Sequence, residues 1–189
     1  MSSVPAQDPA LGLAIAFVNT YDLLEDPPDR LSAARAAHIT RFYGFAELAE
    51  SLAGLSNRDV DRLRRVRNGL YAIFAAPDPD TTVAAVNAAL DDAHVRPRVV
   101  LDGGGQARLT VALEGPGDDP AATLAALAVD ALAHALTVGG PDRFGTCAGD
   151  PCRCVYIDRT RAGRQRFCCQ LCNDRMAAAA YRSRRATRP

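Results

Sequence analysis

Hydrophobic positions recur at helical spacing through most of the chain, most clearly after Ser56. Ser56 and Asp59 have the spacing of a capping box, in which each side chain accepts a hydrogen bond from the backbone N–H of the other residue. Pro77 then interrupts the run. One apolar stripe lies between these limits and predicts an amphipathic helix; its members are Val60, Leu63, Val66, Leu70, Ile73 and Phe74.

Similar patterns predict more helices over Leu31–His38, Gly44–Leu55, Asp80–Ala93 and from Asp119 to Gly139-Gly140. The last of these begins with Asp as N-cap and Pro in the first turn, and it ends at paired glycines. The apolar run Leu11–Val18 is ambiguous, because its alternation at odd positions also permits a strand.

A β-hairpin is predicted where two apolar segments flank a glycine-rich turn. Arg98–Leu101 and Arg108–Leu113 are the expected strands, and Asp102–Gln106 is the turn between them. The fold class expected from these patterns is mainly α with a small β-hairpin.

The net charge of zero conceals two parts of opposite sign. Residues 1–142 hold 11 Arg and 19 acidic residues, a net charge of −8, whereas residues 143–189 hold 11 Arg and 3 Asp, a net charge of +8. The chain contains no Lys, so the choice of Arg carries little information, but the separation of sign does. A basic tail on an acidic body predicts a polyanionic partner for the tail.

All six cysteines lie between Cys147 and Cys172. No apolar run approaches the length needed to cross a bilayer, and the longest, Leu11–Val18, lacks the basic flank of a secretory signal. We therefore expect a cytoplasmic protein with no membrane partner. Clustered thiols in a reducing compartment are more often metal ligands than disulfides.

The cysteine spacing predicts one structural Zn²⁺. One pair is separated by four residues, another by three, and fifteen residues lie between the pairs. Four thiolates complete a tetrahedral site and leave no open position for catalysis. The predicted ligands are Cys147, Cys152, Cys168 and Cys172. Cys154 and Cys169 are the expected spares, although Cys169 and Cys172 have the commoner two-residue spacing.

The segments around these cysteines suggest a treble-clef-like order of knuckle, hairpin and helix. Val155–Ile157 is the expected first strand, Thr160–Arg164 the turn and Gln165–Phe167 the returning strand. A helix should follow Cys172, where four alanines favour it. The predicted organisation is thus an all-helical-type body over residues 1–142 and a small zinc finger over residues 143–189.

The finger resembles the CGNR zinc finger. The resemblance rests on the four expected ligands and on Tyr156, Asp158, Arg164, Phe167 and Arg175, which follow that family's order. The chain departs from the signature, since Cys172-Asn-Asp-Arg175 stands where Cys-Gly-Asn-Arg is expected.

The body resembles the ABATE-type domain that precedes this finger in the same proteins. Three landmarks match in order: Phe17–Thr20, Val66–Tyr71 and Val86–Leu90. Ala16 stands where the family usually has Asp. The resemblance implies a stress-responsive transcription regulator.

The arginines of the finger predict nucleic-acid binding, since guanidinium groups match phosphate oxygens and the basic field attracts polyanions. The candidate residues are Arg159, Arg161, Arg164, Arg166, Arg175, Arg182, Arg184 and Arg185. The favoured function is a DNA-binding transcriptional regulator. The alternative is a zinc-stabilised protein-interaction module whose basic finger docks on an acidic surface, either a partner's or that of its own body.

In the body, Asn19, Thr20 and Arg67 are polar residues beside apolar stripes. They suggest a pocket for a small-molecule effector in which Arg67 binds an anion. The alternative, which we favour, is that they are buried polar groups bonded to the local backbone. In the favoured function, the body senses a signal or forms a homodimer. No phosphate loop and no Ser/His/Asp order appear, so no enzymatic activity is predicted.

Overall fold

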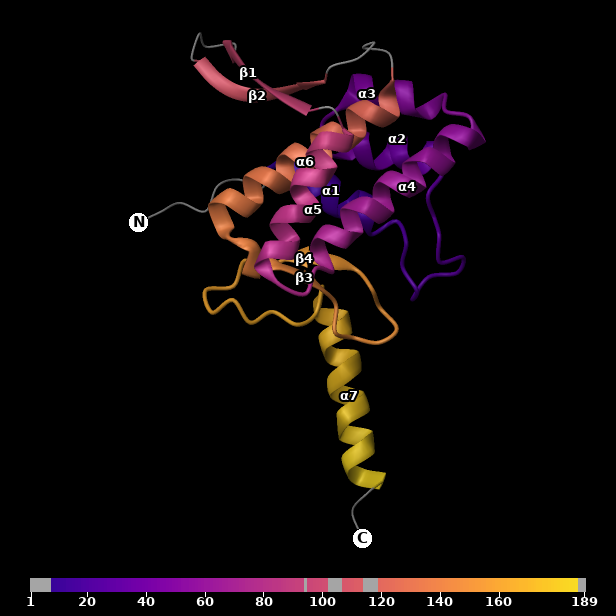
Figure 1. Cartoon of the computed structure of the whole chain (residues 1–189). Coiled ribbons are helices and arrows are strands. Elements are labelled where there is room, and N and C mark those ends of the chain that lie inside the picture. The colour runs from indigo at the N-terminus through magenta and orange to yellow at the C-terminus, as the bar shows by residue number, and fades with distance from the viewer. Residues whose placement is uncertain (1–7, 94, 102–106, 114–118, 187–189) are drawn as a thin grey trace.

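The computed structural model describes residues 8–93, 95–101, 107–113 and 119–186. Figure 1 shows a helical body with a β-hairpin at one end and a single helix, α7, projecting from the other. The helices are α1 (Pro9–Val18), α2 (Ala33–Phe42), α3 (Ala46–Ala53), α4 (Asn57–Phe74), α5 (Pro79–Asp92), α6 (Pro120–Gly139) and α7 (Gln170–Ala186). The strands are β1 (Val95–Leu101), β2 (Ala107–Leu113), β3 (Phe144–Thr146) and β4 (Val155–Ile157). The mainly helical fold class is confirmed.

The ambiguous segment near the N-terminus is a helix. Helix α1 contacts α2, α4 and α6, and Leu13 and Phe17 are fully buried. Because apolar neighbours surround most of this helix, its sequence is apolar on nearly every face and shows no clear helical period. Asp8 begins the helix by accepting a hydrogen bond from the N–H of Ala10.

Side-chain caps start the other body helices close to the predicted positions, except for α3, which begins after Phe45 without a side-chain cap. Ser56 and Asp59 form the predicted capping box at the start of α4. Ser32 begins α2, and Asp78 with Pro79 begins α5 just before the expected residue. Helix α6 begins after Asp119, which accepts bonds from two backbone N–H groups, and ends at a glycine of positive φ, as predicted.

Helix α6 is long and apolar enough to cross a membrane by length and composition. The expectation that no segment reaches this length is therefore wrong for α6. Eight of its twenty residues are buried, and the helix packs against α1, α3, α4 and α5. Packing in the core therefore accounts for its apolar composition.

The predicted hairpin is present. Strands β1 and β2 pair antiparallel, from Val95 opposite Leu113 to Leu101 opposite Ala107. The first strand begins earlier than expected. The expected turn, Asp102–Gln106, lies outside the described residues.

The hairpin of the finger differs from the predicted one. Strand β4 pairs antiparallel with β3, which precedes the first cysteine, so the strand predicted over Gln165–Phe167 is wrong. The backbone there has other partners. The N–H of Gln165 donates to the carboxylate of Asp158 at 2.8 Å, and the carbonyl of Arg166 accepts from Ala148 at 2.8 Å. These bonds hold the segment as a loop beside the knuckle.

The finger packs directly on the body. Val155 of β4 is 1% exposed and belongs to the same hydrophobic core as the body helices. Phe144 of β3 lies against Phe74 of α4, with ring centroids 5.3 Å apart. The apolar core therefore continues from the helices into the strands that carry the cysteines.

Candidate metal centre and basic surface

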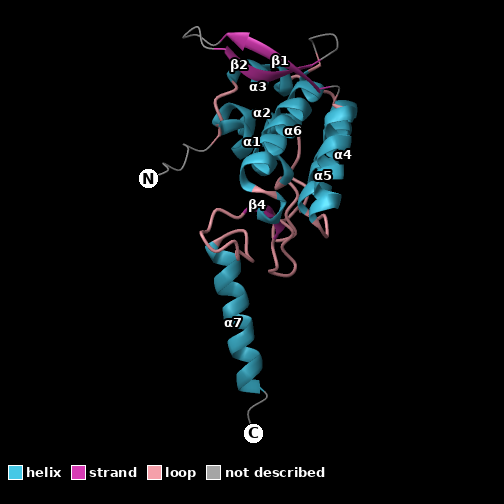
Figure 2. Ribbon diagram, turned by 60° about the vertical axis from the view of Figure 1, so that its left-hand side comes forward, coloured by secondary structure: helices cyan, strands magenta, loops and turns pink. Residues whose placement is uncertain are grey.

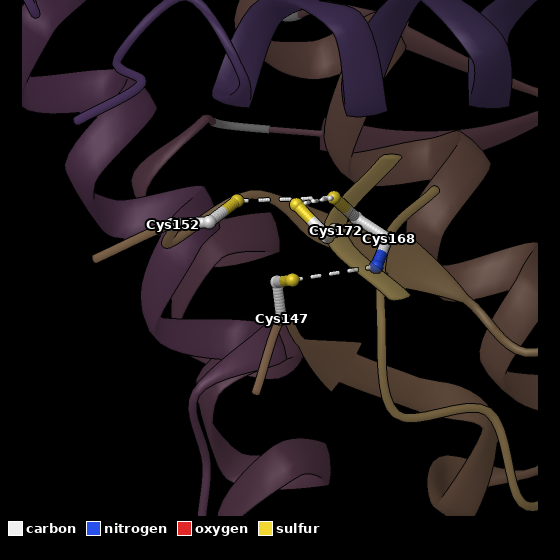
Figure 3. Close-up of side chains that lie close together, drawn as sticks. All are labelled: Cys147, Cys152, Cys168 and Cys172. Carbon is white, nitrogen blue, oxygen red and sulfur yellow. Dashed lines mark hydrogen bonds between the residues drawn. The ribbon is translucent and has the colours of Figure 1, made fainter. Parts of the chain in front are cut away.

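Four cysteine side chains from three segments of the finger point toward one another (Figure 3). Cys147 follows β3, Cys152 precedes β4, Cys168 lies just before α7 and Cys172 lies in its first turn. Their Sγ atoms all lie within 4.8 Å of one another. The structure thus brings together the four residues predicted as ligands.

The sulfur positions suit a tetrahedral ion. Sγ of Cys168 lies 3.8 Å from Sγ of Cys152 and 3.8 Å from Sγ of Cys172. Four sulfurs about 2.3 Å from a central Zn²⁺ would be separated by about 3.8 Å, the edge of that tetrahedron. The cluster is therefore consistent with the zinc site of a zinc finger.

Backbone N–H groups support the sulfurs, as expected for thiolates. Cys168 donates its N–H to Sγ of Cys147 at 3.5 Å, and Cys154 donates to Sγ of Cys152 at 3.5 Å. Burial raises the pKa of the Cys172 thiol to about 11 and also raises that of Cys168. Zinc binding must therefore release protons, so zinc affinity should fall as the pH falls.

Arg175 ties the first turn of α7 to the knuckle. Its guanidinium donates to the carbonyls of Asp150 at 2.7 Å and Gly149 at 2.6 Å. It also lies 3.9 Å from Sγ of Cys172. Arg175, predicted to bind nucleic acid, thus bonds within the finger and adds positive charge beside the thiolates.

We expect Arg175→Ala to weaken zinc binding about 10- to 100-fold, the usual effect of removing a group that supports metal ligands. Competition with a chromophoric chelator measures the affinity. Arg182→Ala, two turns along the same helix and exposed, is the matched control and should bind zinc like the wild type. Equal affinities in both variants would exclude a supporting role for Arg175.

Asp158 organises the loop between β4 and α7. Its carboxylate accepts bonds from the N–H and hydroxyl of Thr160, at 2.7 and 2.6 Å, and from the N–H of Gln165. The residue is 5% exposed. The sequence places Asp158 in the family pattern, but its role becomes visible only when its three donors, up to seven residues away, are located.

Seven other arginines in the described part of the finger are exposed to solvent, whereas Arg143 and Arg153 are partly buried and contact other residues of the chain. Among the described residues, no ion pair with the acidic body is formed by Arg159, Arg161, Arg164, Arg166, Arg182 or Arg185. The seven exposed residues are Arg159, Arg161, Arg164, Arg166, Arg182, Arg184 and Arg185. The first four lie on the loop before α7, and the last three lie on the part of α7 that projects from the body (Figure 2).

The candidate effector residues already have partners within the chain. Arg67 is 3% exposed and donates to both carboxylate oxygens of Asp29, at 2.6 and 3.1 Å. It also donates to the hydroxyl of Thr20 at 3.3 Å. Asn19 exchanges two hydrogen bonds with the backbone of Val155. The three residues therefore have partners inside the chain, but the expected bonding to the local backbone holds only for Thr20, whose hydroxyl donates to the carbonyl of Phe17 at 2.8 Å.

Two family models match the chain and together cover most of it. The model described as "Putative stress-induced transcription regulator", ABATE, matches residues 11–138. The chain belongs to the ABATE family. The model described as "CGNR zinc finger" matches residues 143–185, which include all four clustered cysteines. No curated protein matches the chain closely enough to count as a relative.

The two matches confirm the resemblance drawn from the sequence, and the two models are described as a transcription regulator and a zinc finger, not as enzymes. The structure also explains how the altered signature fits. Asn173, where the family motif has Gly, lies inside α7, where a side chain is accommodated without strain. Asp174 accepts a hydrogen bond from Gln170 at 2.6 Å on the exposed side of the same helix.

Proposed function

We propose that this ABATE-family protein binds DNA through its zinc finger and acts as a transcription regulator in the cytoplasm. The observation that carries the proposal is the surface formed by the exposed arginines of the loop and of α7. The zinc site would fix the start of α7, so that the helix projects its arginines beyond the body. The acidic body would sense a signal or form a dimer, and it would be repelled by the phosphate backbone.

The projecting helix supports DNA as the partner. An α-helix has the diameter that the major groove admits, and most phosphate contacts of DNA-binding proteins come from basic side chains. Residues Met176–Ala180 are small except for the first, so the helix could approach a groove closely before the arginines reach the phosphates.

The decisive experiment is a titration of labelled duplex DNA at about 50 and 200 mM salt. The wild type should bind with a steep salt dependence, and Arg182→Ala/Arg185→Ala should lower the affinity about tenfold or more at low salt. The slope of log K against log salt should fall by about 2, since each lost phosphate contact removes about 0.9.

Arg58→Ala/Arg65→Ala is the matched control, because it removes the same charge from exposed positions on α4. Equal losses in the two double variants would show a general charge effect and contradict a binding surface on α7. Absence of DNA binding by the wild type at low salt, together with capture of an acidic protein, would instead favour the protein-interaction function.

A further inference from the structure

Cys154 is buried beside the four-cysteine cluster but is not part of it. The residue is 8% exposed, and its Sγ lies within 4.8 Å of a carboxylate oxygen of Asp22 and of Sγ of Cys152. Asp22 belongs to the loop after α1, whereas the two cysteines belong to the finger. We propose that Asp22, Cys152 and Cys154 form a second divalent-metal site between body and finger, with the Cys152 thiolate bridging the two ions.

Contacts on both sides of the three residues hold them in place. Val155 donates its N–H to the side-chain oxygen of Asn19 at 2.7 Å, and its carbonyl accepts from the amide of Asn19 at 3.1 Å. The guanidinium of Arg153 stacks on the ring of Tyr21 at 4.6 Å. Residues 19–22 thus run opposite residues 155–152, and the next position in this alignment places Asp22 beside the cysteines.

The same aromatic contact extends to a second helix. Arg153 also lies over the ring of Tyr71 on α4, 4.0 Å from its centroid, so two aromatic rings hold the residue between the two cysteines. Such cation–π contacts restrict the side chain without occupying a sulfur. The separation of Cys152 and Cys154 is therefore set by the body as well as by the finger.

The backbones of the ligands are bonded too. The carbonyl of Cys154 accepts from the N–H of Cys147 at 2.9 Å. Asp22 donates its N–H to the carbonyl of Pro28 at 2.9 Å, and one of its carboxylate oxygens accepts from Leu24 at 3.0 Å. The donor set is thus arranged before an ion binds, which reduces the entropy lost on binding.

A cavity of about 590 Å³ gives solvent access to the three ligands. Asp22, Cys152 and Cys154 line it, and it continues along the finger to the exposed Cys169 and Leu171. An ion can therefore enter without unfolding of the finger. A water molecule from the cavity can supply a fourth ligand.

Two thiolates and one carboxylate suit a borderline-soft ion such as Zn²⁺ and not Mg²⁺ or Ca²⁺, which prefer oxygen ligands. Three protein ligands and a water should bind Zn²⁺ more weakly than four thiolates do. Occupancy would join the loop after α1 to the finger, so zinc availability would control how firmly the body holds the DNA-binding segment. The site itself does not depend on DNA binding.

Metal analysis of the full-length protein, equilibrated with excess zinc and freed of unbound metal on a desalting column, tests the proposal. The wild type should hold two zinc ions per chain, whereas Asp22→Asn and Cys154→Val should hold one. Brief exposure to a weak chelator should reduce the wild type from two ions to one. Cys169→Ser changes an exposed thiol on the same cavity and should still hold two.

Asp22→Asn decides the question if Cys154→Val fails to fold, since it leaves every cysteine and the buried packing of the finger unchanged. Circular dichroism and the retained first ion show that the variant is folded. One ion in the saturated wild type would overturn the proposal. Two ions in both Asp22→Asn and Cys154→Val would also overturn it, because the second ion would then bind elsewhere.

Discussion

The Cys172→Ser protein is expected to lose its tightly bound zinc and the folded finger with it. The side chain is 1% exposed and is the only one of the four ligands inside α7, so its loss separates the helix from the knuckle. Structural zinc contributes about 10–16 kcal/mol of apparent binding free energy in zinc-finger peptides, more than a segment of this size can replace by packing. Metal analysis and limited proteolysis measure the two losses.

The helical signal of the body should persist in this variant, but its melting temperature should fall. Unfolding of the finger would expose the faces of α1 and α4 that β3 and β4 cover, including the contact between Phe74 and Phe144. Cys169→Ser is the control and should keep both zinc and thermal stability. Zinc loss in the control and retention in Cys172→Ser would show that the ligand set is wrong.

The second large effect is expected for Asp29→Ala. Arg67 would keep a buried positive charge with no carboxylate partner, only the Thr20 hydroxyl and the ring of Tyr21 beside it, and an unpaired buried charge costs about 3–5 kcal/mol. For a protein of this size the melting temperature should fall by roughly 6–20 °C. Differential scanning calorimetry measures the change.

Asp61→Ala is the matched control, since this carboxylate pairs with Arg64 at 2.6 Å on the surface. An exposed pair contributes only about 0–1 kcal/mol, so the melting temperature should change little. Equal shifts in the two variants would contradict the structural importance of the pair between Arg67 and Asp29.

The same pair predicts a dependence on pH. The hydrogen bonds from Arg67 lower the pKa of Asp29 to about 2 from its usual 3.8. A lowered pKa in the folded state stabilises the protein above pH 3.8, and this stabilisation is lost as the pH falls from about 4 to 2. The wild type should therefore lose stability over this window by an increment that Asp29→Ala lacks.

Local signals in the sequence predicted most helices of the body and the first hairpin. The cap at Ser56, the start at Asp119-Pro120 and the glycines after α6 act within one turn of a helix, so they can be recognised without knowing the fold. The cysteine spacing similarly predicted the four side chains that meet. Ligand spacing is a local property, because each pair lies on one turn of the chain.

Long-range partners could not be predicted in the same way. The sequence singled out Arg67 but not Asp29, thirty-eight residues before it. It indicated a strand over Val155–Ile157 but assigned the wrong partner, because β3 pairs with it and the Gln165–Phe167 backbone bonds elsewhere. The carboxylate of Asp158 accepts a hydrogen bond from the N–H of Gln165, so this N–H is not available to a neighbouring strand. Whether a side chain or a strand accepts such a bond depends on the folded conformation of the loop.

The sequence by itself determined the helical body, the charge separation and the four-cysteine cluster, since periodicity, composition and short spacings carry that information. Tertiary structure alone decided that the finger packs on the body, that Arg175 supports the knuckle and that Cys154 faces Asp22. The physical reason is that a hydrogen bond or a metal site depends on distances between side chains of a few ångströms. Between segments more than a hundred residues apart, only the packing of the whole chain determines such distances.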